Sequence, residues 1–238
     1  MFDTYNTYNN MRKVPLVNEE IYHIYNRGVD KRDIFSTTLD LDRFLISMKY
    51  FNTKKPIGSI YQHNLQKNKN RAGTSKSLVE IISYHTLPNH FHFILKQKVN
   101  GGISEFMKRL LGGYTNYFNE KQKRSGALFQ GKFKSVHVGE DDYLLVLLGY
   151  VNYNDLIHNI PNVKKHFVRS SIKEIETGDY YFLDKTKTLD YILEKFGSIN
   201  LFKKHCKEVV EIIRTRRAVD IIPEEHFKDL GDLGVEHL

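Results

Sequence analysis

Cysteine, tryptophan and long apolar runs are scarce or missing in this sequence. Its single cysteine, Cys206, excludes an internal disulfide and a zinc site built of cysteines. No run approaches the roughly 20 apolar residues that a membrane span needs. The first residues, MFDTYNTYNNMRK, contain no apolar core of a secretion signal. With only 5 prolines and 40% hydrophobic residues, the 238-residue composition is globular, so we expect a folded cytoplasmic protein.

Acidic residues are also under-represented. The chain carries 36 Lys and Arg against 28 Asp and Glu, a net charge of +8. A basic surface favours a polyanionic partner, and the 15 Tyr and 15 Phe include rings that can stack on unpaired bases. Many basic proteins bind nothing acidic, however, and most aromatic rings lie in cores. Composition alone therefore leaves nucleic acid binding as one of two interpretations.

Apolar spacing and turn residues predict the order of the first elements. Strands are expected over 20–26, 78–86, 91–98 and 132–138, and helices over 39–51 and 103–118. This βαββαβ order is typical of an α+β ferredoxin-like sandwich, in which a four-stranded antiparallel sheet carries helices on one face. Residues 53–76 carry six basic side chains and no acid, which predicts a basic loop that contacts phosphates or is merely solvated.

Three further helices are expected after the last strand. The helix over 140–154 is apolar nearly all round, which predicts burial against a sheet. The others begin after Asp184 and near Leu201. We expect one domain over 1–175 and a C-terminal helical extension over 176–238.

The pair His90 and His92 is the sharpest local feature. Alternate side chains of a strand point to the same face, so both imidazoles would lie side by side with Phe91 turned into the core. Two neutral imidazoles can share a divalent cation. A His-X-His pair in a strand is also often incidental, so the motif alone leaves metal binding open.

Two residues of the apolar helix offer further chemistry. Tyr150 and Asn154 are four residues apart, which places them on one helical face. The Asn154 carbonyl suits Mg²⁺ or Mn²⁺, and the Tyr150 phenol is a candidate nucleophile. Among 15 tyrosines, a simple packing role is the alternative.

Several segments in order resemble the HUH-type single-tyrosine transposases, most closely the REP-associated tyrosine transposases. The segments are Ile21-Tyr22-His23-Ile24-Tyr25-Asn26-Arg27-Gly28 with Asp33-Ile34-Phe35, Leu87-Pro88-Asn89-His90-Phe91-His92, Tyr117-Phe118-Asn119, Arg124 to Ser135, Tyr150-Val151-Asn152-Tyr153-Asn154 and, more weakly, Arg169-Ser170-Ser171. Their order and spacing resemble the family over about 18–175.

The resemblance implies a metal-dependent transferase that nicks and rejoins single-stranded DNA. It implies that His90, His92 and Asn154 bind Mg²⁺ or Mn²⁺, and that Tyr150 forms a 5′-phosphotyrosine. Two features depart from the pattern. Asp155 replaces the usual proline after Asn154, so it lengthens the helix or adds a carboxylate near the metal. Tyr143, seven residues before Tyr150, is a rival nucleophile.

The resemblance also implies a DNA partner. Relatives bind a hairpin or palindromic element and often act as homodimers, sometimes with the tyrosine helix donated to the partner. The candidates for DNA contact are Arg27, Lys121, Lys123, Arg124, Lys132 and Lys134. Two other functions stay open: a non-catalytic DNA-binding protein or repressor, and a metal hydrolase if Asp155 turns inward as a general base.

Overall fold

One antiparallel sheet organises the computed structural model, which describes residues 15–60 and 76–219. Most of the predicted basic loop, residues 61–75, lies outside these residues. The strand order is β4-β1-β3-β2-β5, and the four pairings between these strands are antiparallel. The strands are β1 (Ile21–Arg27), β2 (Val79–Thr86), β3 (His90–Gln97), β4 (Lys134–Val138) and β5 (Arg169–Ser170).

The structure confirms the α+β class and the antiparallel sheet, but the sheet has five strands where four were expected. The fifth, β5, is only two residues long and pairs with the end of β2. Such a short strand carries no alternating pattern, so periodicity alone does not reveal it.

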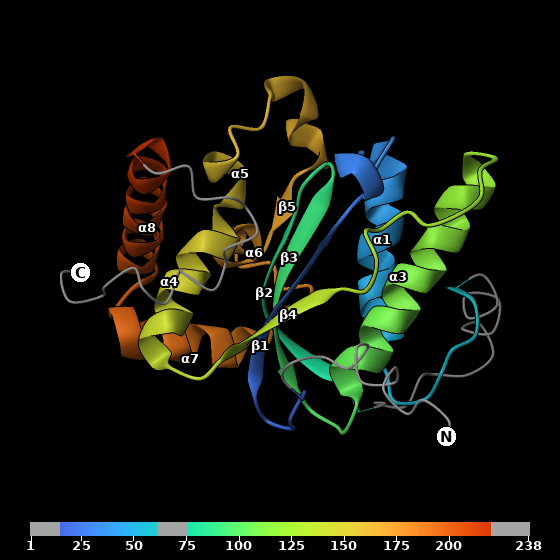
Figure 1. Ribbon diagram of the computed structural model, residues 1–238. Helices are drawn as coiled ribbons and strands as arrows, with labels where there is room; N and C mark the ends of the chain where they lie inside the picture. The colour runs from blue at the N-terminus through green and yellow to red at the C-terminus, as the bar shows by residue number, and fades with distance from the viewer. Residues whose placement is uncertain (1–14, 61–75, 220–238) are drawn as a thin grey trace, which may run out of the picture.

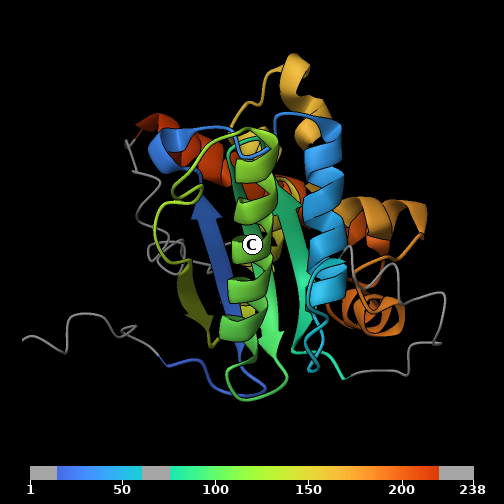
Figure 2. The same cartoon turned by 90° about the vertical axis from the view of Figure 1, so that its right-hand side faces the viewer.

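Two helices cover one face of the sheet, as the sequence predicts. They are α1 (Thr38–Phe51), which Thr37 caps in a capping box with Asp40, and α3 (Gly102–Lys121). Figure 2 shows them side by side in front of the sheet. The Phe44 ring of α1 lies 5.7 Å from the Phe91 ring of β3, so this face buries an aromatic core.

The opposite face is covered as well, which corrects the expectation of helices on one face only. Helix α4 (Asp141–Asn152) lies between the sheet and α8 (Ile199–Val219), as Figure 1 shows. The other elements of the described residues are η1 (Val29–Lys31), α5 (Asn154–Ile157), η2 (Asn162–Phe167), α6 (Ser171–Thr177) and α7 (Lys185–Phe196). Because α4 is apolar nearly all round, it needs apolar cover on both sides.

The C-terminal helices share the core of the sheet. Ile192 of α7 and Phe202 and Val209 of α8 belong to the same buried cluster as the strands and α4. The domain boundary at 175/176 stays a prediction. In the part of the chain that the structure describes, no helix is long and apolar enough to cross a bilayer.

Candidate active site

The two histidines of β3 lie on the sheet face that α4 covers. Their ring centroids are 5.2 Å apart, whereas Phe91 between them packs on Phe44 at the other face. Alternation along the strand therefore places both imidazoles together, as the sequence analysis expected.

Tyr150 of α4 packs directly on this pair. Its ring meets the His92 ring edge-on, with centroids 5.3 Å apart, and its side chain is fully buried. The tyrosine and both histidines thus come together within a single chain. The rival Tyr143 is half-buried, and burial raises its pKa to about 12.

Asn154 lies on the same side, but not on a continuous helix with Tyr150. Helix α4 ends at Asn152, and Tyr153 has non-helical dihedrals (φ −123°, ψ 32°) before the single turn of α5. Asn154 is fully buried, and neither its Oδ1 nor its Nδ2 makes a hydrogen bond of good geometry. The Asn154 side chain lies beside His90 and raises the pKa of that imidazole, although the larger effect of burial lowers it.

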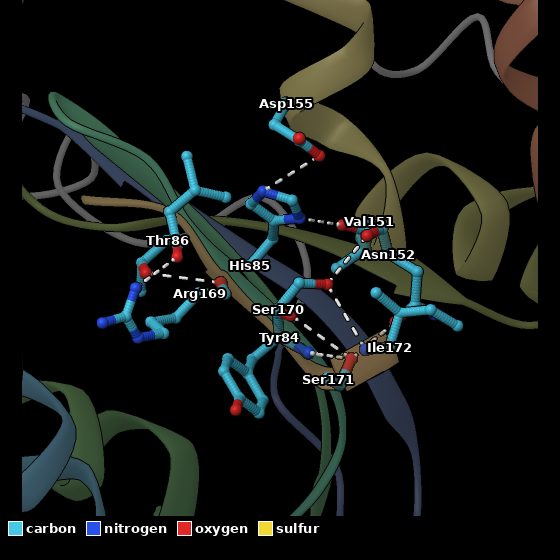
Figure 3. Close-up of polar contacts among 11 residues, drawn as sticks. Tyr84, His85, Thr86, Val151, Asn152, Asp155, Arg169, Ser170, Ser171 and Ile172 are labelled. Carbon is cyan, nitrogen blue, oxygen red and sulfur yellow. Dashed lines mark hydrogen bonds and ion pairs between the residues drawn. The ribbon is translucent and has the colours of Figure 1, made fainter. Parts of the chain in front are cut away.

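Side chains from β2, β5 and α6 fix the C-terminal end of α4 (Figure 3). His85 Nδ1 donates to the carbonyl of Val151 over 2.8 Å, and Ser170 Oγ donates to the carbonyl of Asn152 over 2.7 Å. Ser171 Oγ donates to Asn152 Oδ1 over 2.7 Å. These side chains satisfy polar groups that the helix end leaves open.

Asp155 does not lengthen α4. Its carboxylate lies 3.7 Å from His85 Nε2, as Figure 3 shows, and about a quarter of its side chain is exposed. Asp155, which departs from the family pattern, therefore lies beside a third histidine, His85. His85 belongs to β2, the strand that pairs with β3, which carries His90 and His92.

Burial keeps these histidines neutral. It lowers the pKa of His23 and of His90 to about 3 and that of His85 to about 4, and it holds the pKa of His92 well below its usual value. A neutral imidazole keeps one nitrogen lone pair, which is the form that binds metals.

The residues present fit a divalent cation. Two neutral imidazoles lie beside a buried amide that lacks a well-formed hydrogen bond, and an amide oxygen is a good ligand for a hard cation. Among residues 15–60 and 76–219, no group of three or more His, Cys, Asp or Glu is arranged to hold a metal. A site here therefore depends on Asn154 in addition to the histidine pair.

His23 belongs to this cluster, although the sequence analysis gave it no role. It lies on β1, fully buried, with Nε2 2.9 Å from His92 Nδ1. The contact joins residues 69 positions apart, so only the strand pairing reveals it. The available signals were its place in the strand predicted over 20–26 and in the first of the segments that resemble the transposase family.

A small pocket of about 80 Å³ opens onto the histidine pair. Basic side chains surround it: Arg27 at the end of β1, Lys31 of η1 and Lys134 at the start of β4. Arg27 Nε donates to Gln130 Oε1 over 2.6 Å, which fixes its position at the rim. The pocket therefore suits an anionic group.

The six candidates for DNA contact occupy three kinds of position: at the pocket, exposed away from it, and bonded within the fold. Arg27 and Lys134 line the pocket, and Lys123 and Lys132 are exposed elsewhere. Lys121 instead forms an ion pair of 2.6 Å with the buried Asp40, and Arg124 holds the following loop through Asn119 and Ala127. The structure thus brings two of the six to the histidine pair and gives two others a bonding role within the fold.

Comparison with known proteins finds a family whose model is similar to part of this chain. Residues 46–154 match the model of the IS200-like transposases, and this segment contains His90, His92, Tyr150 and Asn154. The match covers just under half of the chain and confirms the resemblance carried by the motifs. It supports a DNA transposase function.

Curated proteins and solved structures were compared as well. No curated protein matches the chain. One solved structure, described as a REP-associated tyrosine transposase bound to a REP hairpin, is similar at 14% identity with a TM-score of 0.41. The similarity covers 72% of this chain and 88% of that one.

Proposed function

We propose that this protein is a DNA transposase that nicks and rejoins single-stranded DNA, with Tyr150 as nucleophile. The observation that carries the proposal is the contact of Tyr150 with His92, beside His90 and Asn154, within one chain. A phenol, two neutral imidazoles and an amide in one cluster form a nucleophile next to a set of metal ligands. The proposed substrate is single-stranded or hairpin DNA.

The reaction exchanges one phosphodiester for another. Arg27, Lys31 and Lys134 hold the scissile phosphate at the pocket. The phenol oxygen of Tyr150 bonds to phosphorus, the bond from phosphorus to the 3′ oxygen breaks, and the phenol proton ends on that oxygen. The products are a 5′-phosphotyrosine and a free 3′-hydroxyl. Attack by the 3′-hydroxyl of a second strand reverses the exchange, so no external energy source is needed.

His90, His92 and Asn154 are the residues that would hold Mg²⁺ or Mn²⁺. The cation, when bound, supplies Lewis-acid stabilisation of charge on the phosphate. His92 also packs on the nucleophile, so it fixes the position of the Tyr150 ring relative to the ligands.

The burial of Tyr150 sets a condition on this reaction. The side chain is fully buried and does not line the pocket, so the phenol reaches a DNA phosphate only after neighbouring groups move. The same burial is the observation that favours the second candidate function, a DNA-binding protein that does not cleave. A homodimer stays a prediction.

One assay separates the two candidates. The full chain is incubated with a labelled hairpin-bearing single strand and Mn²⁺, and a denaturation-resistant protein–DNA adduct is measured. We expect an adduct with the wild type and with Tyr143→Phe, and none with Tyr150→Phe. An adduct with Tyr150→Phe would show that the nucleophile is wrong. Binding of the strand without any adduct would support the non-catalytic protein.

A further inference from the structure

The hydrogen bond between His23 and His92 has consequences for the proposed metal site. His23 Nε2 and His92 Nδ1 are 2.9 Å apart, and both side chains are almost entirely buried. Their ring planes are only 21° apart and their centroids 5.1 Å apart, as expected for two imidazoles joined edge to edge by an in-plane N–H···N bond. Strand pairing holds the contact, because Tyr25, two residues after His23, pairs with His92 in the β1–β3 register.

This contact determines which nitrogen of His92 is available. A hydrogen bond between two neutral imidazoles needs one N–H and one lone pair. Because Nδ1 of His92 bonds His23, a cation at the pocket would bind His92 through Nε2. Nε2 has a lone pair only if the proton of His92 is on Nδ1, and then His23 must be the acceptor.

We propose that His23 is a positioning residue that accepts the Nδ1–H of His92 and thereby presents Nε2 of His92 to the divalent cation. The inference rests on the proposed metal site and adds a residue to it. His23 lies outside the segment 46–154 that matches the transposase family, on a strand that supplies no proposed ligand.

The choice of acceptor affects the charge of the site. Metal-binding histidines commonly donate their second N–H to a carboxylate or a carbonyl, which raises the basicity of the ligand. Here the acceptor is another neutral ring, and burial lowers the pKa of His92 together with the neighbouring histidines His23, His90, His158 and His85. His23 therefore orients His92 without adding a negative charge that would compete with the DNA phosphate for the cation.

The first test is the tautomer of His92 in the metal-free wild type. Nitrogen-15 NMR of the imidazoles, assigned with His92→Gln, reports which nitrogen carries the proton. We expect Nδ1–H on His92. A proton on Nε2, with His23 as the donor, would overturn the inference whatever the fate of the metal site.

The second test is the affinity for Mn²⁺, measured by titration calorimetry in the absence of DNA. His23→Leu removes the acceptor, and we expect a loss of roughly 10–100-fold. His23→Gln keeps an acceptor oxygen, and we expect much of the affinity back. His137→Leu is the matched control, because His137 lies on the neighbouring strand β4 and bonds Glu20 at the surface. Circular dichroism monitors folding in each variant.

The outcomes separate the two proposals. A wild type with Nδ1–H on His92 that binds no Mn²⁺ would overturn the metal site, and with it the role of His23 there. A wild type that binds Mn²⁺, with a folded His23→Leu that binds equally well, would overturn the inference alone.

Discussion

Gly149 of α4 lies against Val209 of α8 so closely that a Cβ atom at position 149 would be 2.8 Å from the Val209 Cβ. Three atoms of Val209 lie within 3.1 Å of that position, and all belong to a short, branched side chain. Alanine at position 149 must therefore displace one helix. We expect Gly149→Ala to lower the free energy of unfolding by about 1–3 kcal/mol, measured by chemical denaturation.

Gly112 is the matched control for this substitution. It lies inside α3, and a Cβ atom there would meet nothing within 4 Å. Gly112→Ala should stabilise the protein by about 0.5–1 kcal/mol, because alanine favours a helix interior. If Gly149→Ala stabilised the protein equally, the close approach of α4 and α8 would be refuted.

Ser171, which holds the end of α4, should contribute more to stability than its neighbour Ser83, because it makes more hydrogen bonds. Ser171 Oγ donates to Asn152 Oδ1 and accepts the Tyr84 N–H (Figure 3), and it also bonds Ser83 Oγ. The Ser83 hydroxyl has Ser171 as its partner. Ser171→Ala leaves several buried polar groups without a partner, so we expect a loss of roughly 1–3 kcal/mol. Denaturation of Ser171→Ala and Ser83→Ala is the measurement, and an equal loss in both would contradict it.

Acid should destabilise the protein through its buried histidines. Burial lowers the pKa of His23 and His90 to about 3 and of His85 to about 4 in the folded chain. Below pH 6.5 the unfolded chain takes up protons at these positions and the folded chain does not, so the free energy of unfolding falls as the pH falls. Each histidine contributes about 1.4 kcal/mol per pH unit within that window.

His23→Gln removes one buried histidine. The free energy of unfolding should then fall less steeply with decreasing pH, by about 1.4 kcal/mol per pH unit. Denaturation at several values between pH 4 and 7 measures the slope. An unchanged slope would show that His23 does not remain neutral in the folded protein.

Lys134 and Lys121 should behave differently when each is replaced by glutamine. Lys134 lines the pocket, so Lys134→Gln should weaken binding of a hairpin strand and reduce the salt dependence of log K by about 0.7. Lys121 pairs with the fully buried Asp40, so Lys121→Gln should lower stability by roughly 1–3 kcal/mol with little effect on the salt slope. Fluorescence binding at several salt concentrations, with denaturation in parallel, separates the two.

Much of this arrangement follows from local sequence patterns. Alternation of side chains around Phe91 predicts that His90 and His92 lie on one face of the strand. The apolar character of α4 predicts that this helix is buried against the sheet. Both patterns depend on neighbours within one element, which the sequence displays directly.

The rest depends on contacts between distant segments. His23 meets His92 only through the register of β1 and β3, and Gly149 meets Val209 only when α8 folds back over α4. The end of α4 before Tyr153 is bonded by His85 and Ser170, whose positions come from β2 and β5. No periodicity within α4 carries this information, which is why one continuous helix was expected.

The proximity of Tyr150 to the histidines of its own chain has a kinetic consequence. If each molecule holds a complete set of reacting groups, the first cleavage is first order in protein, and its rate per molecule does not change on dilution. Joining of two DNA ends held by separate molecules would instead be second order. Dilution would then separate cutting from joining, and cut DNA would accumulate on the protein as the concentration falls.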